Sequence, residues 1–315
     1  MYYAASALSF TLFAMAISLI DEFYGYGKFG TKNTHKRRAL TILRYFDKTF
    51  GIKKLTDITL EMRLEHVYTM MTRIEEGTMS VATAHNYTTT LNTLCFCIFK
   101  DNQLWLSAVS YFGPRNHVRD EIPQGMNLEQ VLLAHTLLKQ NGHPVFANLL
   151  LVIRCLGLRV REAVSTDYKQ LLASLNDDNQ VRILHGTKGG TGKYVSRYVP
   201  VPYSLFIVLT ELADMQGDSN NVIPADLNRY QYMMQFTHQY YRIRHQAQLG
   251  SFHDLRACKA CEWFEDLTGM MAPVFKQGRV SKKDERAARL IISKRLGHSR
   301  EDITNAYLGG KKDRK

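Results

Sequence analysis

The sequence predicts a mainly α-helical protein with a small β-sheet, an α+β fold class, arranged in two domains. Apolar residues recur at helical spacing through most of the 315 residues, and one short stretch alternates as a β-hairpin. A polar, proline-bounded segment separates two helical parts of the chain. With 45% hydrophobic residues, the chain can bury a sizeable core in each part.

The first domain, expected over residues 1–112, is predicted to be a four-helix bundle with a basic rim. Thr34 is expected to cap the second helix, whose apolar side includes Ala39, Ile42 and Phe46. Gly77 is expected to end the third helix and Ser80 to begin the fourth. On the polar side of the second helix, three consecutive basic residues are candidate DNA contacts: Lys36, Arg37 and Arg38.

The first helix, expected at about Leu8–Phe23, is apolar enough to raise the question of a membrane anchor. The run Ala4–Ile20 approaches transmembrane length and has no charged residue before Asp21. It also contains four hydroxyl residues, and it lacks both a basic flank and a cleavage site. These features favour a core helix, and no membrane partner is expected.

Residues 113–123 are predicted to form a linker, because two prolines and a glycine bound a mostly polar stretch. Arg115 and Arg119 would let this strap follow a phosphate backbone, and a plain solvated linker is an equal alternative.

The second domain, expected over 124–315, begins with helices and then changes pattern. Helices are predicted at Leu128–Lys139, at Pro144–Leu156 and from about Val160. Strands are predicted at Val181–His185 and Tyr194–Val201, on either side of a glycine-rich turn. Helical spacing returns at Ser204 and continues to the end of the chain.

Charge and cysteine content restrict the class of function. Forty-one basic residues against 29 acidic ones give a formal charge of +12, which favours a polyanionic partner, either nucleic acid or an anionic membrane surface. The five cysteines are too few and too scattered for a disulfide framework. Cys258 and Cys261 form one C-x-x-C without a second pair, so buried helix positions are expected and no metal site.

Several short motifs in the second half are each common on their own. Arg159 and Glu162 lie three apart at a helix start, where an ordinary surface ion pair is the simpler interpretation. The glycine-rich turn does not fit the nucleotide-binding P-loop template. The remaining motifs are H-D-L-R at His253–Arg256, L-G-H-S at Leu296–Ser299 and T-x-x-Y at Thr304–Tyr307.

Their order and spacing together resemble the tyrosine recombinase (phage integrase) family. The tyrosine follows the last histidine by nine residues, and the match covers the whole second domain. The resemblance implies a helical core-binding domain and a catalytic domain that form a clamp around DNA.

The resemblance also assigns roles residue by residue. Arg159 and Arg256 correspond to the two phosphate-binding arginines, and Glu162 to the acidic residue that supports the first. Lys188 corresponds to the hairpin lysine, with Lys193 as a rival. The remaining assignments are the histidines His253 and His298, the nucleophile Tyr307 with Thr304 beside it, and Arg197 at the end of the hairpin, a further candidate DNA contact.

The chemistry of a phosphodiester explains why these residue types are suitable. Two guanidiniums can hold non-bridging oxygens whose negative charge grows in the transition state. Tyrosine, with an ordinary pKa of about 10, needs a base or a cationic environment, and His253 is the candidate base. Lys188 can protonate the leaving 5′ oxygen. No cofactor, metal or ATP is needed, because the 3′-phosphotyrosine conserves the bond energy.

The predicted function is therefore site-specific recombination or integration by a homotetramer on two double-stranded DNA recombination sites. A cytoplasmic, DNA-associated protein encoded by a prokaryote, phage or mobile element is expected. Three alternatives stay open: a type IB topoisomerase-like enzyme, a non-catalytic DNA-binding relative, and a basic membrane-surface protein.

Two features depart from the family pattern. His298 follows Arg256 by 42 positions, because a basic insertion lies around residues 270–289. It is expected to be a surface loop, with an added DNA or protomer contact as the alternative, and Ser281 with Asp284 is expected to cap the next helix. Eight residues follow Tyr307, which leaves little for the tail that docks on a neighbouring subunit in relatives.

Overall fold

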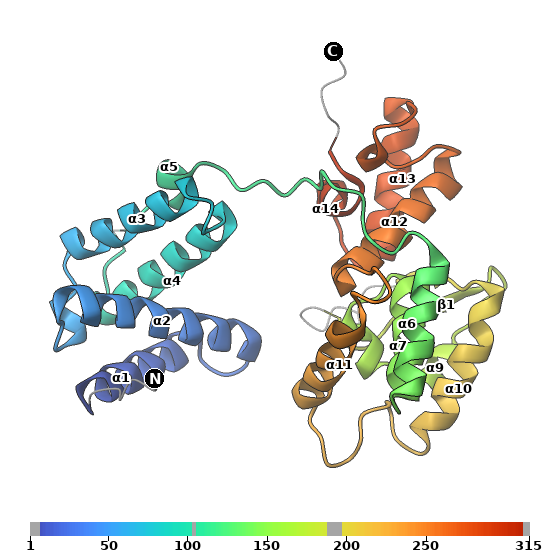
Figure 1. Ribbon diagram of the computed structural model, residues 1–315, viewed down its shortest axis with the longest axis horizontal. Helices are drawn as coiled ribbons and strands as arrows, with labels where there is room; N and C mark the ends of the chain where they lie inside the picture. Colours follow the sequence, from blue (N-terminus) through green and yellow to red (C-terminus); the bar gives the residue numbers. More distant parts are fainter. Residues whose placement is uncertain (1–6, 103–104, 188–196, 311–315) are drawn as a thin grey trace. The chain divides into compact units, whose positions relative to one another are not determined.

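The computed structural model describes residues 7–102, 105–187 and 197–310, and the side chains from Thr11 onward. The chain divides into two compact units, residues 1–116 and 117–315, each with its own hydrophobic core. The division falls within the segment expected to be a linker. Figure 1 shows the helical character of both units.

The first unit is a bundle of helices held together by apolar residues at helical spacing. Leu12, Ala16 and Ile20, four residues apart, are buried on one side of the first helix. Its elements are α1 (Ala7–Tyr24), α2 (Phe29–Phe50), the 3₁₀ turn η1 (Leu55–Asp57), α3 (Leu60–Glu75), α4 (Val81–Phe99) and α5 (Ala108–Phe112). Among the described residues, no helix is both long enough and apolar enough to span a membrane.

The start of α2 differs from the sequence prediction. The helix begins at Phe29, directly after Lys28, whose φ is 49°. Thr34 lies inside the helix, where its Oγ1 donates to the carbonyl of Gly30 at 2.8 Å. This internal hydrogen bond satisfies the hydroxyl without ending the helix. Ser80 caps α4 as predicted, since its side chain accepts from the backbone N–H of Thr83.

The second unit is built around a central buried helix. Its helices are α6 (Leu128–Gln140), α7 (Pro144–Leu156), α8 (Val160–Ser165), α9 (Tyr168–Ala173), α10 (Phe206–Gln216), α11 (Arg229–Ile243), α12 (Phe252–Thr268), α13 (Lys282–Arg295) and α14 (Asn305–Leu308), with 3₁₀ turns η3 (Tyr203–Leu205), η4 (Pro273–Phe275) and η5 (Glu301–Thr304). Helix α7 packs against α6, α10 and α12, and α12 packs against α13 and α14 (Figure 1).

The β-hairpin is present, and its first strand ends at Arg182 rather than at His185; residues 194–196, predicted to begin the second strand, lie outside the described residues. Strands β1 (Gln180–Arg182) and β2 (Tyr198–Pro200) pair antiparallel, with Val181 opposite Val199. The N–H of Ile183 also donates to the carbonyl of Arg197 at 2.9 Å. Lys188 and its rival Lys193 lie outside the described residues.

Residues 117–123 belong to the second unit, because Arg119 hydrogen-bonds the segment that carries Tyr307. The basic insertion around residues 270–289 is a surface loop only in part. Its side chains are mostly exposed from Lys276 to Asp284, but it also includes η4 and the first two turns of α13, where Glu285 and Arg289 are buried. Ser281 caps α13 by accepting from the N–H of Asp284, as predicted.

Candidate active site

Glu162 is the centre of an arginine network at the start of α8. Its carboxylate is fully buried and accepts from Arg159 Nη1 at 2.6 Å and from Arg197 Nη1 at 2.8 Å. The Nη1 of Arg256 lies 3.5 Å from its second oxygen. Burial alone would raise the pKa of Glu162, but the three cations outweigh it and hold the pKa below its usual range. Glu162 therefore fixes several guanidiniums in one place.

Arg256, from the first half of α12, connects this network to Tyr307. It is 2% exposed, and it donates to the carbonyls of Gly157 and Leu296. Its Nε donates to the Tyr307 hydroxyl at 3.3 Å. Burial lowers the pKa of Arg256 to about 10, so it stays a cation at neutral pH. A fixed cation therefore lies at the oxygen expected to attack phosphorus.

Two histidines flank Tyr307. The ring centroid of His253 lies 4.9 Å from that of Tyr307, and the ring centroid of His298 lies 6.2 Å from it. Nε2 of His298 is 3.0 Å from Arg159 Nη2, and because arginine can only donate, this nitrogen accepts. Burial and neighbouring arginines lower the pKa of His298 to about 4, which keeps it neutral. The pKa of His253 is also lowered, first by partial desolvation and then by Arg119 and Arg256.

The short segment that bears Tyr307 is fixed by a buried arginine of α13. Arg289 is 1% exposed and pairs with Glu285 on its own helix at 2.9 Å. It donates to the Thr304 hydroxyl at 2.9 Å, to the Asn305 side chain at 3.1 Å and to the Gly309 carbonyl at 2.9 Å. These contacts lie on both sides of the tyrosine, so Arg289 holds the segment from within the protein.

Tyr307 itself lies on α14 and is 4% exposed. Beside it, Thr304 is fully buried, and its hydroxyl donates to the Glu301 carbonyl at 2.6 Å. The structure thus brings together six residues that the sequence pointed to: Arg159, Glu162, His253, Arg256, His298 and Tyr307. Arg159 lies directly before α8 and Glu162 on it. His253 and Arg256 lie on α12, His298 in the turn after α13, and Tyr307 on α14.

The expected DNA contacts have different surroundings. In the first unit, Lys36 pairs with Asp21 at 2.5 Å, Arg37 is exposed, and Arg38 is half-buried. Arg115 donates to the Asn86 side chain at 3.1 Å.

Arg197 and Arg119, also expected to contact DNA, make hydrogen bonds to groups of the protein itself. Arg197 is 3% exposed and donates to Glu162 and to the carbonyl of Arg295, although its buried Nη2 has no partner among the described residues. Arg197 is therefore part of the buried network and not a surface residue. The side chain of Arg119 is 14% exposed and pairs with Asp254.

Sequence reasoning missed Arg289 as a residue of the site. The available signal was its position on the apolar side of α13, in step with Ala288 and Ile292, four residues after Glu285. A charged pair on the buried face of a helix indicates an internal network.

The two cysteines of α12 are buried side chains. Burial raises the pKa of Cys258 and of Cys261 to about 12, which keeps both as thiols at neutral pH. Within residues 7–102, 105–187 and 197–310, no group of three or more histidine, cysteine or acidic side chains is arranged to hold a metal ion.

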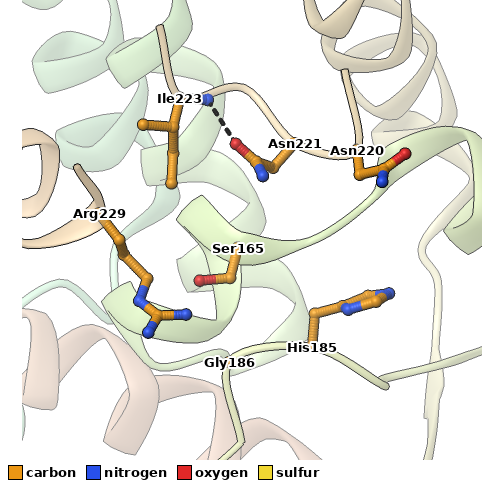
Figure 2. Close-up of a pocket in the computed structure, with 7 residues that line it drawn as sticks. All are labelled: Ser165, His185, Gly186, Asn220, Asn221, Ile223 and Arg229. Carbon is orange, nitrogen blue, oxygen red and sulfur yellow. Dashed lines mark hydrogen bonds between the residues drawn. The ribbon is translucent and has the colours of Figure 1, made fainter. Parts of the chain in front are cut away.

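A polar pocket of about 370 Å³ lies beside the end of α8. Figure 2 shows the side chains around it, with the Asn221 side chain accepting from the N–H of Ile223 at 2.9 Å. Its lining residues are Ser165, His185, Gly186, Asn220, Asn221, Ile223 and Arg229. None of these lining residues is one of the six residues gathered around Tyr307.

Comparison with proteins of known structure identifies the fold of this chain. No protein-family model and no curated protein sequence matches the chain. Among solved structures, a lambda integrase dimer bound to a COC′ core site is 15% identical, with a TM-score of 0.56, covering 95% of this chain and 79% of that one. The Tn1549 transposon integrase in complex with transposon right end DNA is 13% identical, with a TM-score of 0.57, covering 96% of each chain.

A lambda integrase tetramer bound to a Holliday junction gives a similar match, 13% identical with a TM-score of 0.55, over 95% of this chain and 77% of that one. The chain therefore has the fold of the tyrosine recombinases, mainly helical with a two-stranded sheet. The resemblance seen in the sequence motifs is confirmed at the level of the fold.

Proposed function

We propose that this protein is a site-specific DNA recombinase that cuts and rejoins DNA through a 3′-phosphotyrosine. The observation that carries the proposal is the hydrogen bond of 3.3 Å between Arg256 Nε and the Tyr307 hydroxyl, inside a network of arginines. A nucleophile and a phosphate-binding cation in contact are what attack on a phosphodiester requires. The tyrosine recombinase fold supports the same conclusion.

In the proposed reaction, the Tyr307 oxygen attacks phosphorus and the bond from phosphorus to the 5′ oxygen breaks. The phenolic proton passes to His253, whose lowered pKa keeps it neutral and able to accept. Arg159 and Arg256 hold the non-bridging oxygens. Lys188 supplies the proton that the leaving 5′ oxygen takes up. The reverse attack by a 5′-hydroxyl from a second duplex restores the backbone.

His298 takes the role of a hydrogen-bond partner for Arg159 in this proposal. Its Nε2 accepts from Arg159 at 3.0 Å in the neutral form. It thereby orients the guanidinium that is to meet the phosphate, and the fully buried Glu162 does so from the other side. Double-stranded recombination sites are the proposed partners, and the lambda integrase tetramer on a Holliday junction supports a tetramer on two duplexes.

The test is a covalent trap. Duplexes that bind the protein are first selected from a pool of random sequences. They are then prepared with a nick, so that the short strand bearing the freed 5′-hydroxyl diffuses away after cleavage. We expect a protein–DNA adduct that survives denaturing electrophoresis with the wild-type chain and none with Tyr307→Phe. Tyr203→Phe is the matched control, because Tyr203 is 91% exposed and lies outside the cluster.

Each alternative predicts another outcome. A non-catalytic DNA-binding protein gives no adduct with the wild-type chain, and an undiminished adduct with Tyr307→Phe would remove the tyrosine from the mechanism. A type IB topoisomerase-like enzyme gives the adduct and relaxes supercoiled plasmid, but does not exchange strands between two short duplexes. Sequencing the DNA next to the trapped tyrosine would identify the target site.

A further inference from the structure

Arg119, in the strap that begins the second unit, contacts both halves of the candidate site. Its Nη1 donates to Asp254 Oδ1 at 2.9 Å, and its Nε donates to the carbonyl of Ala306 at 3.3 Å. Its backbone N–H donates to the carbonyl of Asn305 at 2.9 Å. The side chain is 14% exposed, so most of it lies against protein.

Two of the side-chain partners of Arg119 are next to the two groups that must exchange a proton, and the third is the carbonyl of Glu121 in the same strap, at 3.5 Å. Asp254 follows His253 at the start of α12, and Ala306 precedes Tyr307 on α14. Asp254 is itself fixed, because it accepts from the backbone N–H of Ser251 at 2.8 Å and from its hydroxyl at 2.6 Å. One planar guanidinium therefore joins the segment of the base to the segment of the nucleophile.

We propose that Arg119 is a positioning residue that sets the distance between the His253 ring and the Tyr307 hydroxyl. The inference rests on the proposed function and assigns Arg119 a part in it. Proton transfer and attack need geometry held to a fraction of an ångström, and an error of about 1 Å can lower a rate on the order of 10²-fold. The two donors of Arg119 supply such a constraint from outside α12 and α14.

The positive charge of Arg119 also favours the proton transfer, because it lowers the pKa of His253. His253 faces Arg119 on the strap, Arg256 and Asp254 on α12, and Arg159 before α8, while Tyr307 faces it from α14. The arginines lower the pKa of His253 and Asp254 raises it. Removing Arg119 takes away one of the cations that lower the pKa of His253 and leaves Asp254 without its ion-pair partner, so the pKa of His253 rises. His253 then loses its proton, and becomes able to act as a base, only at higher pH.

A direct contact between Arg119 and a DNA phosphate is the competing explanation. It predicts weaker binding and a shallower salt dependence, by about one unit of slope, with little change in the rate at saturating DNA. Positioning predicts the opposite: unchanged affinity and a slower chemical step.

The experiment measures single-turnover adduct formation on the nicked substrate at saturating protein, from pH 5.5 to 9. Three chains are compared: wild type, Arg119→Gln and Arg119→Lys. We expect Arg119→Gln to slow cleavage on the order of 10–100-fold, to leave Kd within about twofold, and to move the acidic limb of the rate profile to higher pH. Arg119→Lys keeps the charge but cannot make both contacts, so the rate falls while the acidic limb moves less.

Arg242→Gln is the control, because Arg242 is an exposed arginine of α11, away from these contacts. Thermal unfolding checks that each variant is folded, and Arg119→Lys serves as the test if Arg119→Gln is not. Wild-type rates in Arg119→Gln, or a change confined to Kd and its salt slope, would overturn the positioning role. A wild-type chain that forms no adduct would instead contradict the proposed function.

Discussion

At the scale of single residues, Glu162 is a fully buried carboxylate among three arginines. A fully buried carboxylate is stable here because Arg159, Arg197 and Arg256 surround it. The converse also holds: Arg197 and Arg256 are buried cations that depend on this single negative charge. Removing one partner of a buried ion pair leaves the other charge without compensation, which is far more damaging than losing a surface pair.

We therefore predict that Glu162→Gln destabilises the second unit by about 3–5 kcal/mol, although it preserves the shape of the side chain. Urea unfolding followed by circular dichroism measures the change. Because the folded-state pKa of Glu162 is depressed, its stabilisation is present above the ordinary glutamate pKa and is lost as pH falls through the folded value. The free energy of unfolding of the variant should therefore fall less at acidic pH than that of the wild type.

Glu129→Gln is the comparison variant, since Glu129 is an exposed residue in the first turn of α6. Its effect should stay within about 0.5 kcal/mol. A loss of less than 1 kcal/mol in Glu162→Gln would show that the arginines do not depend on this carboxylate.

The candidate site could be predicted from sequence where its residues lie in local motifs. Arg159 with Glu162, and His253 with Arg256, are three residues apart on helix starts, a spacing visible in the sequence. The contacts of Arg119 could not be predicted, because its partners are 135 and 187 residues away. A polar linker sequence contains no information about a partner so distant.

At the scale of elements, the loop after β1 passes unusually close to α8. Gly186 has φ +68°, and a Cβ placed there would lie 2.4 Å from the Arg161 carbonyl and 2.7 Å from the Cα of Glu162. The absence of a side chain therefore lets the hairpin base lie directly against the helix that holds Arg159 and Glu162.

We predict that Gly186→Ala destabilises the protein by about 1–3 kcal/mol more than Gly269→Ala, and slows adduct formation. Gly269 is the control, because it has φ +69° but open space around it, so it isolates the backbone strain. Thermal unfolding and the nicked-substrate assay measure the two effects. Equal destabilisation by both substitutions would show that the close approach is unimportant.

Helix prediction succeeded where capping and apolar spacing agree. Helix α7 has the predicted bounds, Pro144–Leu156, with proline at its first position and Gly157 after its last. The start of α2 was wrong because Thr34 resembles a cap in sequence, although its hydroxyl is satisfied inside the helix. The described ends of both strands were predicted too long, because Ile183 and Val201 are β-branched residues that lie beyond the three pairs of the ladder.

At the scale of the whole molecule, the two units have separate cores and one tryptophan each. Trp105 lies in the first unit and is 52% exposed, whereas Trp263 is 2% exposed in the core of the second. Chains with two cores commonly depart from two-state unfolding.

We predict that unfolding of the Trp105→Phe variant gives two different midpoints. Tryptophan fluorescence then reports Trp263 and the second unit, while far-ultraviolet circular dichroism follows the helices of both. Urea titration with both probes measures the difference, and the wild-type dichroism curve shows whether the substitution itself changes stability. Superimposable curves from the two probes would mean that the units unfold as one.

The contact between Arg119 and Ala306 also has a consequence for how the protein folds. It closes a loop of 187 residues, and contacts of such sequence separation form late because the chain must lose much of its freedom first. A newly made or partly folded chain that lacks this contact holds the segment bearing Tyr307 at fewer points. We therefore expect that segment to become fully fixed only in the last stage of folding.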